Sequence, residues 1–253
     1  MIYYICKVNI KILGKEPKMK LITVNSQQEL GLLAADIFSE VINSKPDPVL
    51  GLATGSTPIP LYKELIKRCR DGKLDFSEVR TINLDEYAGL PGTHDQSYRY
   101  FMNDNLFDHI NIKPENTYVP NGLAEDPKAE CARYDELIKS MGGIDLQLLG
   151  VGFNGHLAFC EPSDTFSNKT QYIKLADVTI NANARFFSDP SAVPKFAFSM
   201  CIRDIMLAKK ILLLAGAEKK DIIHKAVYGD ITPQVPASVL QMHSDATIIL
   251  IDD

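Results

Sequence analysis

Short apolar segments alternate with longer amphipathic segments along most of this chain. The short segments have strand length, and apolar residues recur with helical spacing in the longer ones. Strands are predicted at residues 21–24, 49–53, 80–84, 144–149, 211–215 and 247–251. Helices are predicted at about residues 27–43, 61–69, 98–107, 127–141 and 195–207, and from about residue 219. This alternation predicts a mostly parallel α/β sheet covered by helices.

Two predicted helices carry signals at their first turns. Ser26 and Glu29 form a capping-box pattern before the first helix. Asp126 is the predicted N-cap of the helix at 127–141, and Pro127 suits its first turn.

One polar segment breaks the alternation. Residues 160–183 are rich in Ser, Thr, Asn and Asp, and we predict that they form a mobile lid over a site. Neither an internal repeat nor a linker interrupts residues 19–253, which we predict to form a single domain. Residues 1–18 are predicted to be an N-terminal extension that carries no chemistry.

Composition and charge exclude several classes of protein. The 253 residues are 45% hydrophobic, which suffices for a sizeable core, and the net charge of -5 argues against nucleic acid or an anionic membrane as partner. No apolar segment approaches the ~18–20 residues that span a bilayer. The five cysteines are scattered and contain no Cys-x-x-Cys pair, so we predict reduced thiols, no metal and a cytoplasmic location.

The loop after the strand at 49–53 has the form of a phosphate site. Thr54, Gly55, Ser56 and Thr57 stand between a strand and a helix, where backbone N–H groups, hydroxyls and a helix N-terminus can bind an anion. The Gly-Lys-Ser/Thr ending of a nucleotide-binding P-loop is missing. The alternative interpretation is an ordinary helix cap with Pro58 in the first turn.

Two adjacent carboxylates end the strand at 80–84. Asp85 and Glu86 can titrate at different pH values if one is desolvated and the other is hydrogen-bonded. One of them can then act as a base near neutral pH. The alternative is a solvated acidic strand end that caps a nearby loop.

A glycine-rich turn follows the strand at 144–149. Its glycines have the G-x-G-x-x-G spacing, but Pro162 disfavours the long helix that a dinucleotide site requires. His156 in this turn and Glu161 after it suit an imidazole whose tautomer is set by a carboxylate, as general acid–base catalysis requires.

Two cations after the polar segment have two open interpretations. Arg185 and Lys219 are either surface charges or the positive groups of a phosphate pocket. The other histidines show no metal-ligand spacing, and we assign no role to His94, His109, His224 and His243.

Five motifs in chain order resemble those of the glucosamine-6-phosphate deaminase family. They are LGLATGSTP, NLDEYAGL, LLGVGFNGHLAFCEP, NARFF and PASVLQMHSD, and the resemblance runs from about residue 19 to the C-terminus. It implies a modified doubly wound, Rossmann-like sheet with helices on both faces. It also implies conversion of glucosamine 6-phosphate and water into fructose 6-phosphate and ammonia, without cofactor or metal, in amino-sugar catabolism.

The resemblance assigns roles to particular residues. Asp85 resembles the base that moves the C2 proton to C1, and His156 resembles the group that opens the sugar ring, oriented by Asn154 and Glu161. The implied substrate and phosphate contacts are Thr54, Gly55, Ser56, Thr57, Glu86, Gly152, Arg185 and Lys219.

Some positions differ from those usual in the family. Cys160 and Cys201 stand where Asn and Gly are usual, and Gln171 and Ile173 replace basic residues of the allosterically activated branch. We therefore expect a non-allosteric enzyme that is a monomer or a homodimer.

Two other functions share this architecture. A 6-phosphogluconolactonase has a related Gly-His-x-Ala turn, but the segments around Glu161 and Asp85 resemble the deaminase. A sugar-phosphate sensor in a transcriptional regulator needs a DNA-binding module, for which this chain leaves no room.

Overall fold

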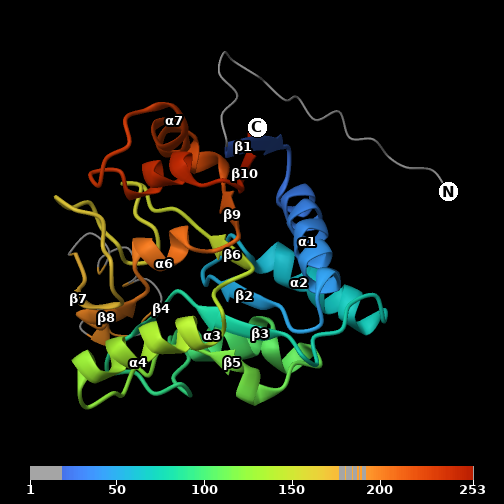
Figure 1. Ribbon diagram of the computed structural model, residues 1–253, viewed down its shortest axis with the longest axis horizontal. Coiled ribbons are helices and arrows are strands. Elements are labelled where there is room, and N and C mark those ends of the chain that lie inside the picture. The colour runs from blue at the N-terminus through green and yellow to red at the C-terminus, as the bar shows by residue number, and fades with distance from the viewer. Residues whose placement is uncertain are drawn as a thin grey trace.

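A seven-stranded parallel sheet forms the centre of the computed structural model, which describes residues 19–176, 180, 184, 187, 189 and 192–252 (Figure 1). The strand order is β1-β10-β9-β6-β2-β3-β5, and every neighbouring pair is parallel. The strands are β1 (Met19–Val24), β2 (Val49–Leu52), β3 (Arg80–Asn83), β5 (Thr117–Tyr118), β6 (Leu146–Leu149), β9 (Lys210–Ala215) and β10 (Ala246–Ile251). The sequence predicts all of them except β5, which contains two residues.

The strand order reverses at the centre of the sheet. From β2 the chain continues to β3 and β5 on one side, then returns to β6 on the other side of β2 and continues to β9 and β10. This is the doubly wound arrangement that the resemblance implies. In such sheets ligands bind at the carboxyl ends of the strands next to the reversal, here β2 and β6.

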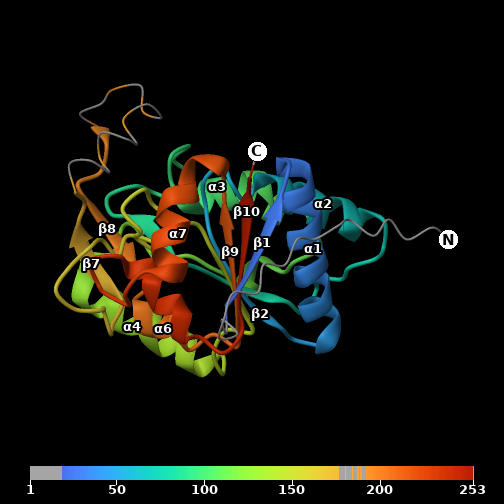
Figure 2. The ribbon, with the colours of Figure 1, turned by 90° about the horizontal axis from the view of Figure 1, so that it is seen from above.

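Helices cover both faces of the sheet. Figures 1 and 2 show α1 (Gln27–Ser44) and α2 (Ile59–Arg70) on one side and α6 (Ile202–Met206) and α7 (Lys220–Tyr228) on the other. The other helices of the described ranges include α3 (Tyr98–Asn105), α4 (Pro127–Ser140) and the 3-10 turns Phe107–His109, Pro114–Asn116, Ala217–Lys219 and Pro236–Met242. Because both faces are covered, consecutive residues of the central strands are buried, as at Leu212, Leu213 and Leu214.

Both predicted helix caps are confirmed. The Ser26 hydroxyl accepts a hydrogen bond from the Glu29 N–H at 3.1 Å, and the Glu29 carboxylate accepts one from the Asn25 N–H at 2.8 Å. Asp126 accepts hydrogen bonds from the backbone N–H groups of Lys128 and Ala129, at 2.9 and 3.1 Å.

A second, smaller sheet lies beside the first and corrects two predictions. It consists of β4 (Asp85–Tyr87), β8 (Phe196–Ser199) and β7 (Gln171–Lys174), all antiparallel. The predicted helix at 195–207 is wrong in its first half, because β8 pairs with a strand on each side and only α6 follows it as helix. Asp85 likewise begins β4 instead of ending β3.

Parts of two predictions lie outside the described residues. The N-terminal extension at 1–18 belongs to this group, as do several positions of the predicted lid. The described part of that polar segment contains β7, which is the edge strand of the small sheet. None of the helices in the described ranges is long and apolar enough to cross a bilayer.

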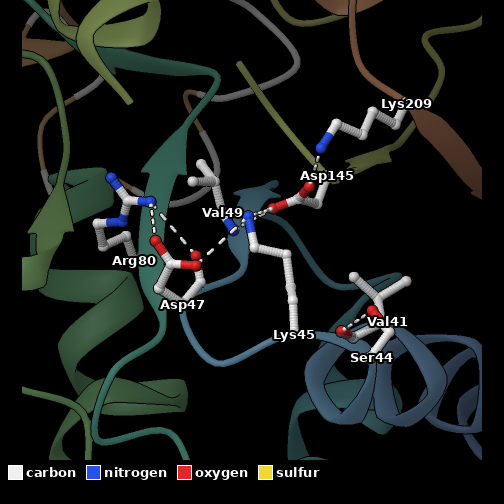
Figure 3. Close-up of polar contacts among 8 residues, drawn as sticks. All are labelled: Val41, Ser44, Lys45, Asp47, Val49, Arg80, Asp145 and Lys209. Atoms are coloured by element: carbon white, nitrogen blue, oxygen red, sulfur yellow. Dashed lines mark hydrogen bonds and ion pairs between the residues drawn. The ribbon is translucent and has the colours of Figure 1, made fainter. Parts of the chain in front are cut away.

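An ion network joins the strands at the amino end of the parallel sheet (Figure 3). The buried Asp145, just before β6, accepts hydrogen bonds from the Val49 N–H at 2.8 Å, Lys45 Nζ at 3.0 Å and Lys209 Nζ at 2.7 Å. Asp47 lies nearby in the same network but is more than half exposed. The network therefore ties the start of β2 to the segments that lead into β6 and β9.

Replacing Asp145 by Asn should lower the free energy of unfolding by about 1–3 kcal/mol, because the Val49 N–H is left with a poorer buried acceptor. Burial acts to raise the pKa of Asp145, but hydrogen bonds from Lys209, Val49 and Lys45 outweigh it and lower that pKa. The stabilisation is thus present above the pKa of the unfolded carboxyl and is lost as pH falls through the lower folded value. Urea unfolding at neutral and acidic pH measures both effects.

Asp47→Asn is the matched control for this change. Asp47 is exposed and pairs with Arg80 at 2.9 Å, so its loss should change the free energy of unfolding by less than about 1 kcal/mol. Equal effects of the two substitutions would show that the buried hydrogen bond to Val49 adds nothing to the free energy of unfolding beyond what an exposed ion pair adds.

Candidate active site

The strand register brings three predicted site loops to one edge of the sheet. Leu52 pairs with Asn83, so the loops that follow β2 and β3 begin at the same level. Gly51 pairs with Gln147, so the glycine turn after β6 begins beside them. This edge is the carboxyl end next to the reversal of strand order, where doubly wound sheets bind ligands.

The loop at 54–57 leaves β2 and enters α2 without a side-chain cap. Gly55 has a φ of +95°, in the left-handed region that favours glycine. The N-cap of α2 is Pro58, and no side chain accepts from the first N–H groups of that helix. The interpretation as an ordinary capped helix start is therefore not realised. Within the described ranges, the hydroxyls at 54, 56 and 57 form no hydrogen bond, so these groups can all contact an anion.

Asp85 carries a buried carboxyl group. Asp85 is 7% exposed, and none of the described residues donates a hydrogen bond to its side chain. Burial, and secondarily the negative charge of Glu86, raises the pKa of Asp85 to about 8. Such a group can both accept and return a proton near neutral pH.

Glu86 has a different environment from its neighbour. Its Oε1 accepts from the N–H groups of Tyr87 and Tyr98, both at 2.8 Å, and its Oε2 accepts from the Arg99 N–H at 2.9 Å. Burial raises the pKa of Glu86, and these three N–H groups oppose the rise. The carboxylate thus caps the first turn of α3, and the substrate contact that the resemblance implies for Glu86 stays a prediction.

His156, Asn154 and Glu161 form one hydrogen-bonded chain. His156 Nδ1 lies 2.8 Å from Asn154 Oδ1, and Asn154 Nδ2 donates to Glu161 Oε2 at 2.6 Å. Because the amide oxygen can only accept, the imidazole donates through Nδ1–H, so that the neutral form of the ring has its lone pair on Nε2. The structure thus brings together the imidazole, the amide and the carboxylate that the sequence predicted to act together.

Gly152 makes space for the His156 ring. A Cβ atom at position 152 would lie 2.2–2.5 Å from three atoms of the imidazole. The Gly152 N–H also donates to the His156 carbonyl at 3.0 Å, which closes the turn. Its observed role is therefore to leave space for the imidazole.

Ala158, two residues after His156, has a φ of +51°, an uncommon conformation for a residue with a side chain.

Lys219 reaches the same end of the sheet from the neighbouring strand. It ends the 3-10 turn Ala217–Lys219 after β9, which pairs with β6. Partial burial lowers the pKa of Lys219, and the nearby Glu218 opposes this effect. Arg185, the second predicted phosphate contact, lies outside the described residues.

An aromatic cluster that no sequence motif predicted surrounds β4. The rings of Tyr98 and Phe159 stack with centroids 6.0 Å apart, and Tyr87 lies 4.9 Å from Tyr98. Burial raises the pKa of Tyr98 well above its ordinary value, with smaller contributions from neighbours that include Asp85. These rings help to exclude water from the carboxyl group. No sequence signal linked Tyr98 to Asp85, because helix α3 supplies it from a separate segment.

Cys160 packs behind the site. Its Sγ lies 3.2 Å from the Met200 carbonyl and 3.9 Å from the hydroxyl of Ser199, the residue that pairs with Asp85 across the small sheet. Cys201 donates from Sγ to a carboxylate oxygen of Asp204 at 3.1 Å. Both thiols are buried, so their contacts are part of the packing.

A cavity of about 310 Å³ lies beside the candidate site and shares only part of its residues. Cys160, Glu161, Gln171 and Pro236 are among its lining residues. Asp85, His156 and the loop at 54–57 do not line it. Among the described residues, no three His, Cys, Asp or Glu side chains converge on a point where a metal ion could bind.

The doubly wound sheet and the acid–base groups at its strand reversal define an α/β enzyme. Residues 25–249 match the family model described as glucosamine-6-phosphate isomerases/6-phosphogluconolactonase. The chain belongs to this family.

Relatives within the family differ in how close they are. A glucosamine-6-phosphate deaminase of Lachnoclostridium phytofermentans is 57% identical over 232 residues, which cover 91% of this chain and 98% of that protein. The solved structure of a monomeric glucosamine-6-phosphate deaminase has a TM-score of 0.89 and 44% identity, covering 92% of this chain and 97% of that chain. A 6-phosphogluconolactonase of Thermotoga maritima has a TM-score of 0.74 but 17% identity, covers 93% of this chain and 100% of that chain, and supports the fold alone.

Proposed function

We propose that this chain converts glucosamine 6-phosphate and water into fructose 6-phosphate and ammonia, in amino-sugar catabolism. The relatives named glucosamine-6-phosphate deaminase support this substrate. The observation that carries the chemistry is the buried carboxyl of Asp85 at the same sheet edge as the imidazole of His156.

The proposed reaction uses two proton-transfer groups. His156 moves the proton that opens the sugar ring, and Asn154 and Glu161 hold its imidazole in the required tautomer. Asp85 then takes the proton from C2 of the open-chain sugar and delivers it to C1. A second proton passes from the C2 amino group to O1, so that C1 becomes an alcohol and C2 an imine. Water adds to this imine, its oxygen becomes the keto oxygen, and the nitrogen leaves as ammonia.

The proposed phosphate site combines backbone and side-chain donors. The loop at 54–57 and the uncapped N-terminus of α2 provide N–H groups and hydroxyls. Lys219 provides a positive charge, and Arg185 remains part of the proposal as its second cation. These contacts hold the sugar at an atom that does not react.

Replacing Lys219 by Met should raise KM for glucosamine 6-phosphate about tenfold or more, with a smaller change in kcat, because one charged contact to the phosphate is lost. Steady-state kinetics at constant ionic strength measures the effect. Lys220→Met is the matched control, because the neighbouring Lys220 pairs with Asp252 instead. An unchanged KM in Lys219→Met would place the phosphate elsewhere.

A product assay tests the proposed function directly. The purified protein is incubated with glucosamine 6-phosphate in metal-free buffer while ammonia and fructose 6-phosphate are followed together, and 6-phosphogluconolactone is tested in parallel. Equal release of both products from the amino sugar is expected. Lactone hydrolysis without amino-sugar turnover would move the chain to the lactonase branch of the family, and no turnover with retained sugar-phosphate binding would favour a sensor.

We further infer a monomer or homodimer in a reducing, cytoplasmic compartment. The monomeric relative at 44% identity supports the small assembly. Gln171 and Ile173 carry no positive charge, which supports a non-allosteric enzyme. The described cysteines Cys69, Cys131, Cys160 and Cys201 are all unpaired, as reducing conditions require.

A further inference from the structure

Phe153 is an exposed aromatic residue within the glycine turn. It stands between Gly152 and Asn154 and is 72% exposed, the largest value among the exposed large hydrophobic residues of the described ranges. Lys219 Nζ lies 3.0 Å from the centroid of its ring. This is the geometry of a cation–π contact, in which the negative face of the ring attracts the ammonium group.

The ring attracts the Lys219 ammonium without neutralising it. Within the described ranges, no carboxylate forms a salt bridge with Lys219, although Glu218 precedes it in the chain. A carboxylate partner would compete with a phosphate group for the ammonium, whereas an aromatic face leaves its N–H donors available. The contact can therefore fix the position of the charge while the charge remains ready for an anion.

We infer that Phe153 is a positioning residue that holds the Lys219 ammonium beside the glycine turn, ready to bind the substrate phosphate. This inference rests on the proposed function, which assigns the phosphate to Lys219. It also connects two parts of the site, because the turn that presents Phe153 is the turn that holds Asn154 and His156. The distance between phosphate and imidazole is then set within one short segment.

Kinetics of Phe153→Leu and Phe153→Tyr test this role. Leu retains apolar bulk but lacks the ring face, so KM for glucosamine 6-phosphate should rise about two- to fivefold, the size of an exposed cation–π contact, with kcat nearly unchanged. Tyr keeps the ring face and should restore the wild-type KM. In a Lys219→Met background, Phe153→Leu should have no further effect, because the ammonium that the ring positions is gone.

Two further measurements do not depend on turnover. Affinity for inorganic phosphate, measured by calorimetry, should fall in Phe153→Leu by the same factor as KM rises. Modification of Lys219 by an amine-directed reagent, followed by mass spectrometry, should become faster, because the ammonium loses both its cover and the interaction that favours its charged form. If these readouts change although no deaminase activity is found, the positioning role holds and the proposed function fails.

Three results would overturn the inference. The first is an unchanged KM and phosphate affinity in Phe153→Leu. The second is an equal effect of Phe153→Leu with and without Lys219, since the ring would then act on the substrate independently. The third is failure of Phe153→Tyr to restore the wild-type values, since shape and not the ring face would then be decisive.

Discussion

Replacing Asp85 by Asn should lower kcat by about 10²- to 10⁴-fold while sugar-phosphate binding is retained, because the amide cannot take the C2 proton. The proposed phosphate contacts lie in other loops, so KM should change little. Exchange of the C2 proton of the substrate with solvent deuterium, followed by NMR, reports this step directly. Undiminished turnover would remove Asp85 from the role of base.

The pH dependence of the wild type provides a second check on Asp85. Burial raises its pKa to about 8, and a base must be deprotonated to act. We therefore expect kcat/KM to rise about tenfold per pH unit below about pH 8 and to level off above it. A profile that is flat from pH 6 to about pH 9 would contradict the assignment.

The same pKa shift affects folding stability. The folded pKa of Asp85 lies above the ordinary value of 3.8, so its contribution to stability is fully present below about pH 4 and is lost as pH rises to about 8. Asp85→Asn removes this loss, because an amide has no charge to bury. The difference in Tm between the variant and the wild type should therefore shift in favour of the variant as pH is raised through this range.

Gly152→Ala should lower kcat by about 10²-fold, because a Cβ atom would lie 2.2–2.5 Å from the His156 ring and must displace it. The hydrogen bond between His156 Nδ1 and Asn154 would then be lost, and with it the orientation of the imidazole that is proposed to act in catalysis. Steady-state kinetics together with a thermal melt separates this local effect from unfolding.

Gly150→Ala is the matched control within the same turn. A Cβ atom at position 150 meets nothing within 4 Å, and the φ of Gly150 is not in the left-handed region. This variant should therefore retain nearly normal turnover. Equal losses in both variants would show that the turn tolerates no side chain at all, and that the contact with the imidazole is not the cause.

The parallel sheet and its first helices follow from local signals in the sequence. Leu50 and Leu212 belong to short apolar segments that helices bury on both faces, and such segments are recognisable without a structure. Ser26 and Asp126 start their helices through hydrogen bonds to residues two or three positions away. Because such hydrogen bonds join residues that are close in the sequence, the sequence alone predicts them reliably.

The small sheet and the environments of Asp85 and Glu86 depend on contacts between residues far apart in the sequence. Phe198 belongs to a segment whose local pattern favours a helix, but strands from two other parts of the chain pair with it. Glu86 caps a helix that begins a dozen residues later, at Tyr98. Local patterns in the sequence predicted both carboxylates as site residues. Only the folded structure shows that Asp85 is buried without donors from the described residues, whereas Glu86 caps helix α3.

The ion network around Asp145 and the candidate active site lie at opposite ends of the same strands. A substitution at the amino end can therefore change how firmly the sheet is held without moving His156 or Asp85. Adaptation of such a chain to a higher temperature can therefore raise its folding stability without lowering its catalytic activity. Changes at residues such as Lys45 and Lys209 should therefore alter the free energy of unfolding and leave the chemistry at the opposite edge unchanged.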